Sequence, residues 1–323
     1  PLAIDKLMPN KWLNDNEEGG KNQYEEEFLK RLMAQNGKNW KFSFDKLVRP
    51  EQGRKLVDNI QKVYDADFSV IVYNFLDILS HARTETDIIR ELTEDDAAFR
   101  SLTRSWFEHS DLYTILKLLS ERGHTVVITS DHGTSPSFDT GHEESDRFNT
   151  RQFEVIVNGF LNVRYGMGDW VLEYEDKCVY LNHNLIYERG LDLAEVQNEV
   201  AIFAMQFRGV SHALSATAMR TSYFGSGYAR KMQNSFYPRR SGDVILNLMP
   251  GWIEEQERCW SSSGSMYGYD TQVPLVFYGF GAGPLRVKRR VDMTAVAPTV
   301  ARVLEITEPA ASEGEVLPEI IDF

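Results

Sequence analysis

The chain has 323 residues, of which 42% are hydrophobic and 26% are charged, so its composition is that of a globular protein and excludes disordered, collagen-like and low-complexity classes. Its 35 Lys and Arg and 48 Asp and Glu give a net charge of −13, which excludes a general nucleic-acid binder, since such proteins need clustered basic residues. No apolar run reaches about 18 residues, so we expect no membrane-spanning helix, and no signal-peptide pattern is visible. The two cysteines have no CxxC spacing, which favours a reducing compartment.

The first part of the sequence predicts a β–α–β unit. We expect a helix over residues 24–35 and then a short, almost wholly apolar strand over residues 67–75. Residues 97–122 carry apolar side chains at helical spacing and end before Gly123, which predicts one long helix. A second apolar strand is predicted over residues 124–130. Two strands joined by such a helix are parallel, with a right-handed crossover.

The remaining sequence continues to alternate strands and helices. A polar loop is expected at 134–150, a strand at 177–182, a helix at 191–207, strands at 242–250 and 273–279, and a last helix at 292–304 that must begin close to Pro298. This alternation predicts an α/β fold, a three-layer α/β/α sandwich with a mostly parallel sheet. We expect a single domain over residues 1–323, with a cap or subdomain within residues 160–245.

Side chains with metal-binding chemistry follow both strands of the β–α–β unit. Asp77 and His81 are four residues apart after the first strand, so one helical turn would place both on one face. Asp131 and His132 come directly after the second strand. Because they are adjacent, they would either bind different ions or depend on an irregular backbone at Gly133. Ligands of parallel α/β sheets bind beyond the carboxyl ends of the strands, so we expect the four side chains to converge. Mixed Asp and His ligands suit zinc or a similar divalent ion.

Ordinary structural interpretations of these residues stay open. An Asp after a strand often caps a helix, and a His can be a satisfied core residue. Arg83 could contact a phosphoryl oxygen through its guanidinium, or form a surface ion pair with Glu85 or Asp87.

Other polar residues favour structural roles. A structural role is favoured for each of the single histidines, which are His109, His124, His142, His183 and His212. Among them, His142 is the best candidate for an extra metal ligand. Residues 238–243 contain two arginines and predict a turn before a strand more than a substrate clamp.

Longer segments of the chain resemble known families. The segments VYNFLDILSHARTE, RSLTRSWFEHSDLY and VVITSDHGT lie within residues 1–134 and resemble the PglZ-type domain of PorX-like response regulators. From about residue 150, RRSGDVILNLMPGW and GSMYGYDTQVPLVFYG resemble the carboxyl-terminal half of PafA-type bacterial alkaline phosphatases. Both families belong to the alkaline phosphatase superfamily, so the chain resembles a composite of two branches. A divergent natural member and a recombined or designed sequence would both give this pattern.

The resemblance implies a phosphoryl-transfer site with two zinc ions, although one ion could also be held. Asp77 and His81 match the superfamily's Asp-x-x-x-His ligands, and Asp131 and His132 match its Asp-His pair. The superfamily's first strand and its helix with the Ser or Thr nucleophile have no match, so no catalytic nucleophile is identified. A third His is also expected, but Ser263 stands in its place, and a neutral hydroxyl is a poor zinc ligand.

The resemblance therefore favours a metal-dependent hydrolase of phosphoric esters, either a phosphatase or a phosphodiesterase. The PglZ-like part favours oligonucleotide or cyclic-nucleotide diesters, and the PafA-like part favours small monoesters. The alternative is a non-catalytic or truncated output module that keeps a residual metal site. We expect a phosphate ester or nucleotide as substrate and a homodimer or a signalling partner. A cytoplasmic location is expected, or a periplasmic one if the PafA-like part decides.

Overall fold

A computed structural model describes most of the chain. The described residues are 25–35, 37, 39–74, 79, 96–133, 135–136, 147–239, 241–255, 261–262, 264–281, 284–310 and 312–321. They contain a mixture of helices and strands, which confirms the α/β class. In this part of the chain, no helix combines the length and the apolar character needed to cross a membrane.

The chain divides into two compact units. Unit 1 is formed by Pro1–Leu76, Arg100–Ile128 and Leu275–Phe323, and unit 2 by Asp77–Phe99 and Thr129–Pro274. The prediction of a single domain with a cap or subdomain within residues 160–245 stays a prediction.

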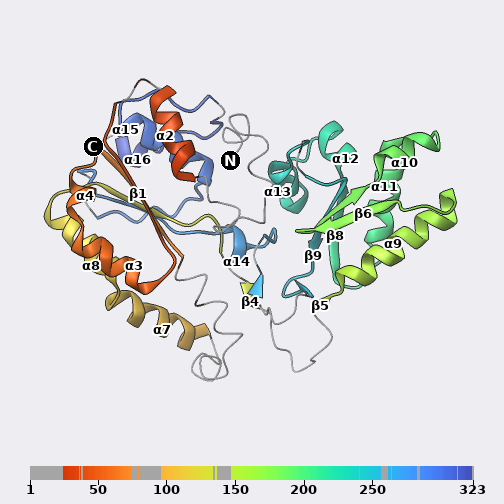
Figure 1. Ribbon diagram of the computed structural model, residues 1–323, viewed down its shortest axis with the longest axis horizontal. Helices are drawn as coiled ribbons and strands as arrows, with labels where there is room; N and C mark the ends of the chain where they lie inside the picture. Colours follow the sequence, from red (N-terminus) through yellow and green to blue (C-terminus); the bar gives the residue numbers. More distant parts are fainter. Residues whose placement is uncertain are drawn as a thin grey trace. The chain divides into compact units, whose positions relative to one another are not determined.

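Unit 1 packs helices against parallel strands (Figure 1). Its elements are α2 (Glu25–Gln35), β1 (Phe42–Leu47), α3 (Pro50–Asp58), α4 (Gln61–Tyr64), β2 (Phe68–Tyr73), α8 (Asp111–Glu121), β3 (Val126–Thr129), β12 (Leu275–Tyr278), the 3₁₀ turn η1 (Met293–Ala295), α15 (Val296–Val303) and α16 (Pro318–Ile321), with α7 (Asp96–Glu108) crossing the unit boundary. Strand β1 pairs in parallel with β2, and β3 pairs with β12. The core of this unit joins β1 to α3, α4 and α8. Its buried residues are Leu47, Leu56, Val63, Ile115 and Leu119.

The predicted long helix over residues 97–122 is wrong, because the structure has two helices there, α7 and α8. Ser110 separates them with an extended backbone, φ −84° and ψ 156°. Its Oγ accepts a hydrogen bond from the amide of Tyr113 at 3.1 Å and donates one to the carbonyl of Phe107 at 2.8 Å. One hydroxyl therefore ends α7 and caps α8, which the apolar spacing alone does not reveal.

Unit 2 is built around an antiparallel sheet with helices on both faces. Its elements are β4 (Ser135–Pro136), β5 (Arg147–Phe148), α9 (Thr150–Tyr165), β6 (Val171–Glu175), β7 (Cys178–Leu181), α10 (His183–Glu188), α11 (Leu193–Ala204), β8 (Val210–Ser215), α12 (Ala216–Thr221), α13 (Gly227–Ser235), β9 (Val244–Leu248), β10 (Ile253–Glu254), β11 (Ser261–Ser262) and α14 (Gly268–Thr271). The main sheet has the order β6-β7-β9-β8 with every pair antiparallel, whereas β5 and β10 pair in parallel. The described strands therefore pair both in parallel and antiparallel, and the four-stranded sheet of unit 2 is wholly antiparallel.

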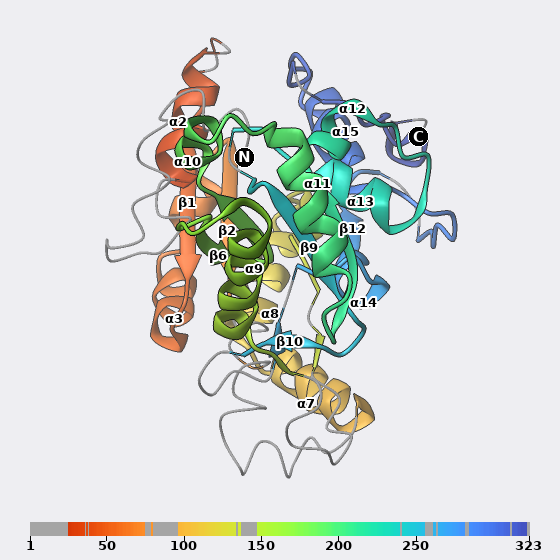
Figure 2. The same ribbon diagram turned by 90° about the vertical axis from the view of Figure 1, so that its right-hand side faces the viewer.

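Strand β9 lies at the centre of that sheet and divides two apolar clusters. Val244, Leu246 and Leu248 face the cluster that contains side chains of α9 and α11, and Figure 2 shows these two helices on one side of β9. Ile245 points the other way and packs with Met219 of α12 and Met232 of α13. Alternation along one strand therefore fills both interfaces of the sheet.

Candidate functional site

The predicted Asp-His pair lies directly after β3. The Asp131 carboxylate is 82% exposed, and its Oδ1 accepts a hydrogen bond from the His132 amide at 3.0 Å. The same Oδ1 lies 3.8 Å from Nε2 of the His132 ring. Ser130 Oγ donates to the His132 carbonyl at 2.7 Å. The two side chains therefore lie beside each other at the end of the strand, and their convergence with Asp77 and His81 stays a prediction.

The His132 ring is held in the form that can bind a metal. Its Nδ1 lies 2.6 Å from the carbonyl oxygen of Gly133, and a carbonyl only accepts hydrogen bonds, so Nδ1 carries the proton. In the neutral ring the lone pair is then on Nε2, the atom beside the Asp131 carboxylate. A backbone carbonyl that orients a histidine in this way is a common partner of metal-binding histidines.

The other predicted site residues lie outside the described residues. These are Asp77 and His81, the substrate-contact candidate Arg83, the extra ligand candidate His142, and Ser263 at the position of the third His. Over the residues that the structure describes, no group of three or more His, Cys, Asp or Glu side chains is gathered tightly enough to hold a metal ion. The four-ligand set therefore stays a prediction, of which one pair is described.

Gly133 fixes the Asp-His pair against a second segment of unit 2. Its amide donates to the Asp270 carbonyl at 2.8 Å. A Cβ at this position would lie 1.9 Å from the carbonyl oxygen of Tyr269, and real Cβ atoms do not come so close to backbone. Only glycine allows this approach. It brings the Tyr267–Asp270 segment, which follows the expected place of the third His, next to the Asp-His pair.

Asp270 supplies a buried carboxylate at this junction. Asp270 is only 4% exposed, and its Oδ2 accepts a hydrogen bond from the Ser265 amide at 2.8 Å. Oδ1 is buried and has no hydrogen-bond partner. A buried carboxylate oxygen without a partner costs free energy unless a cation or a proton is near. Asp270 does not join Asp131 and His132 in a group that could hold a metal ion in the described part of the chain, so its carboxylate is a separate buried charge next to the turn.

Tyr267 beside Asp270 acts as a hydrogen-bond donor. Its hydroxyl donates to the Leu248 carbonyl at 2.9 Å, and burial is the main cause that raises the pKa of the phenol. It therefore stays protonated at neutral pH and holds the segment to β9. From the sequence, we used the segment GSMYGYDTQVPLVFYG only for its family resemblance and missed Asp270, although an Asp that directly follows Tyr-Gly-Tyr is a signal of a buried polar role.

A comparison with family models identifies one match. The model described as the BREX system PglZ alkaline phosphatase-like domain matches residues 1–212. This match continues well beyond residue 134, the end of the PglZ-like segments in the sequence, and includes the Asp131–His132 pair. It confirms the PglZ resemblance over more of the chain than those segments indicate.

Individual relatives support the second resemblance. The chain is 26% identical over 208 residues to a calcium-transporting ATPase of Myroides odoratus and 23% identical over 207 residues to alkaline phosphatase PafA of Elizabethkingia meningoseptica. These alignments cover 63% and 64% of this chain but 38% of each relative, so the chain spans about two fifths of their length. The crystal structure of wild-type PafA matches with a TM-score of 0.66 and 20% identity over 84% of this chain and 53% of that chain. At this identity the likeness shows the fold, that of an alkaline phosphatase.

Proposed function

Because the chain belongs to the BREX system PglZ alkaline phosphatase-like domain family, we propose that it is a metal-dependent hydrolase of phosphoric esters, with zinc as its metal. The observation that carries this proposal is the Asp131–His132 pair, with the ring proton on Nδ1 and the lone pair of Nε2 beside a carboxylate. The relatives that carry phosphatase names support the class of reaction.

The chain's own residues have distinct tasks in this proposal. Asp131 and His132, together with Asp77 and His81 as the sequence predicts, would hold the metal. A zinc ion bound there would polarise the phosphoryl oxygen and favour attack by a nucleophile. The Gly133 carbonyl keeps the His132 ring in its metal-binding form. Arg83 is proposed to bind a phosphoryl oxygen with its guanidinium fork.

The backbone around Gly133 has a positioning task. The hydrogen bond from the Gly133 amide to the Asp270 carbonyl ties the Asp-His pair to a segment that is itself held by Tyr267. A site on such a fixed turn keeps its ligands oriented, which catalysis by electrostatic stabilisation requires. Substrates of both ester classes are proposed, because the PglZ-like part favours diesters and the PafA-like part favours monoesters.

The second candidate function is a binding or output module that keeps a metal without turnover. Ser263 in place of the third His and the lack of an identified nucleophile favour it. A homodimer, a signalling partner and a cytoplasmic location stay predictions for both candidates.

The test is to measure zinc by elemental analysis and ester hydrolysis on the same preparations. The wild type is compared with Asp131→Ala/His132→Ala and with His109→Ala. His109 is a matched control, since it is exposed and its Nδ1 also bonds a backbone carbonyl, that of Ser105 at 2.8 Å. We expect about two zinc ions per wild-type chain, and loss of both the metal and at least about 100-fold in rate in the double variant only.

The substrates for this test are p-nitrophenyl phosphate and bis(p-nitrophenyl) phosphate, which distinguish a phosphatase from a phosphodiesterase. Metal that depends on Asp131 and His132 without turnover of either ester would support the binding module. A wild-type chain without stoichiometric metal, or a double variant as active as the wild type, would contradict the proposed hydrolase.

A further inference from the structure

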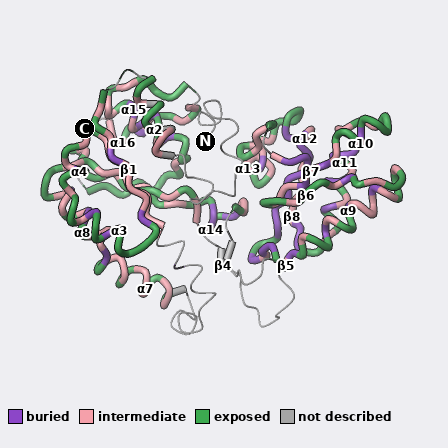
Figure 3. Tube along the Cα trace, in the orientation of Figure 1, coloured by how far each residue is buried: buried purple, intermediate pink, exposed green. Residues whose placement is uncertain are grey.

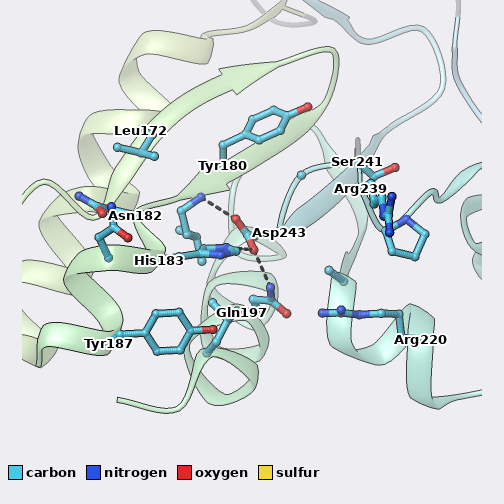
Figure 4. Close-up of a pocket in the computed structure, with 16 residues that line it drawn as sticks. Leu172, Tyr180, Asn182, His183, Tyr187, Gln197, Arg220, Arg239, Ser241 and Asp243 are labelled. Carbon is cyan, nitrogen blue, oxygen red and sulfur yellow. Dashed lines mark hydrogen bonds and ion pairs between the residues drawn. The ribbon is translucent and has the colours of Figure 1, made fainter. Parts of the chain in front are cut away.

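Unit 2 contains a pocket that the proposed hydrolase site does not use. Its volume is about 600 Å³, which lies within the range of small-molecule sites. It is lined by residues of β7, α10, α11 and α12 and by the segment that leads into β9 (Figure 4). All of these elements belong to unit 2.

The floor of the pocket is a buried polar network around Asp243. This residue is 7% exposed, and its carboxylate accepts three hydrogen bonds. The donors are the Leu181 amide at 2.7 Å, His183 Nε2 at 2.7 Å and Gln197 Nε2 at 2.6 Å. Oxygen Oε1 of Gln197 in turn accepts from the amide and the hydroxyl of Thr217, at 3.1 and 2.7 Å. These hydrogen bonds join four elements and hold the side chains of the network in place, so the floor of the pocket is preorganised.

His183 connects this network to the open part of the pocket. A carboxylate only accepts, so Nε2 of His183 carries the proton that bonds Asp243. The side chain is 46% exposed, and its other nitrogen, Nδ1, has no hydrogen-bond partner in the described part of the chain. Nδ1 can therefore accept a hydrogen bond from a ligand when the ring is neutral, or donate one when it is protonated.

Two arginines give the pocket an excess of positive charge. Arg220, at the end of α12, and Arg239, before β9, both line it, and both are exposed. Neither forms an ion pair with a carboxylate among the residues that the structure describes. Figure 4 shows Arg220 reaching toward Gln197 and Arg239 lying beside Ser241. The one carboxylate of the pocket, Asp243, is already occupied by its three donors, so both guanidinium groups are available to an anion.

Aromatic and amide groups line the remaining surface. Tyr180 and Tyr187 contribute their rings, and Asn182 and Asn184 are next to His183. Partial burial raises the pKa of Tyr180 to about 12, so its hydroxyl is neutral at physiological pH. Guanidinium forks match phosphate oxygens, and tyrosine rings suit a planar base or sugar face.

We propose that this pocket binds a small phosphate monoester of nucleoside monophosphate size, with Arg220 and Arg239 on the phosphate and His183 on the rest of the ligand. It is a second anion site in a strongly acidic chain, and it needs no metal. The inference rests on the charge and the geometry of the pocket and does not depend on the proposed hydrolase activity.

Calorimetric titration tests the proposal with three probes. The first is the analogue of AMP in which a methylene group replaces the ester oxygen, so that hydrolysis cannot cleave it. The second is adenosine, which lacks the phosphate, and the third is inorganic phosphate. We expect the analogue to bind, adenosine to bind at least about tenfold more weakly, and phosphate alone to compete with the analogue.

Variants assign the binding to the pocket. Arg220→Ala and Arg239→Ala should each weaken binding of the analogue about tenfold or more, since each removes a charge-assisted contact. Arg220→Lys should lose less, because it keeps the charge without the fork. Arg151→Ala is the matched control, an exposed arginine of α9 outside the pocket, and should leave the Kd unchanged. Circular dichroism establishes that every variant is folded.

Three outcomes would overturn the inference. The first is equal affinity of the arginine variants and the wild type, and the second is equal affinity for adenosine and the analogue. The third is loss of binding in Asp131→Ala/His132→Ala alone, which would assign the phosphate to the candidate metal site. Unchanged binding in that double variant supports the second site even if the chain has no hydrolase activity.

Discussion

Two apolar strands, one in each unit, reach very different depths of burial. Strand β2 in unit 1 reads Phe-Ser-Val-Ile-Val-Tyr, and every residue is only half-buried. Strand β9 in unit 2 reads Val-Ile-Leu-Asn-Leu, and every residue is buried, in the purple part of the trace beside β8 in Figure 3. Strand β9 lies between β7 and β8 and has apolar side chains of helices on both faces. Burial therefore follows from what pairs with a strand and covers it, more than from how apolar the strand is.

The cores of the two units differ in the same direction. The main cluster of unit 2 contains sixteen buried residues in the described part of the chain, against five in the cluster of unit 1. The larger cluster also contains fully buried aromatic residues such as Phe153 and Trp170. Truncations in unit 2 should therefore have the larger effects on stability.

Phe153→Ala is expected to have the largest effect. The side chain is 1% exposed, and its ring contacts Phe207 at a centroid distance of 4.8 Å and Phe148 at 5.1 Å. Its removal leaves a cavity and should lower the free energy of unfolding by about 3–5 kcal/mol, measured by urea denaturation. Val163→Ala on the same helix, 91% exposed, should change it by less than about 0.5 kcal/mol. Equal effects of the two would break the comparison.

Ile115→Val tests the smaller core of unit 1. Ile115 of α8 is fully buried in the cluster with Leu47 of β1 and Leu56 of α3, and the change removes one methylene group. The free energy of unfolding should fall by about 1 kcal/mol. Ile202→Val in α11, where the side chain is 67% exposed, serves as the control and should be near neutral. A larger fall in the free energy of unfolding for Ile202→Val than for Ile115→Val would show that burial does not determine the effect of these substitutions.

Gly159→Ala should stabilise unit 2 in spite of its dense core. The residue lies inside α9, and a Cβ there would have no heavy atom within 4 Å. Alanine should raise the free energy of unfolding by about 0.5–1 kcal/mol because it restricts the unfolded chain and favours the helix. The thermal midpoint measures the change. A decrease would mean that α9 packs more closely at this position than the structure shows.

The smallest effect concerns an exposed pair in unit 1. Arg289 binds both carboxylate oxygens of Glu319, each at 2.7 Å, and this hydrogen bonding is the main cause that lowers the Glu319 pKa from 4.5 to about 2. A lowered folded pKa means that the contribution to stability is present above about pH 4.5 and is lost as the pH falls toward 2. NMR titration of the Glu319 carboxyl should show this, and Arg289→Ala should return its pKa toward 4.5. An unshifted titration in the wild type would contradict the pairing.

Much of the fold could be predicted from the sequence. Helix 24–35, strand 67–75 and strand 242–250 are confirmed within a few residues, and Pro298 falls in the first turn of α15 as required. Strands β6 and β8 were missed because their apolar residues alternate with Glu, Ser or His, which is typical of half-buried strands in an antiparallel sheet. Strand β1, which pairs in parallel with β2, was missed because Ser43, Asp45 and Lys46 interrupt its apolar residues. The turn at Asp176 and Lys177, with φ of 46° and 64°, gives no glycine signal for the β6–β7 hairpin.

The candidate sites show where local reasoning ends. Asp131 and His132 are adjacent in the sequence and follow a strand, so the sequence alone predicts that they lie side by side. Asp243 and His183 are sixty residues apart, and their contact exists only because β7 pairs with β9. Sequence reasoning assigned His183 a structural role and predicted residues 238–243 as a turn, and it had no means of joining them into one pocket.

The close approach at Gly133 changes how the Asp-His-Gly signature should be weighed in searches for relatives. A Cβ on Gly133 would lie 1.9 Å from the Tyr269 carbonyl oxygen, so a glycine is required there by the packing of the backbone. The close approach does not involve the side chains of Asp131 and His132, which under the proposed function bind the metal. Under the proposed function, a relative without catalysis would keep the glycine for packing and could change the two residues before it.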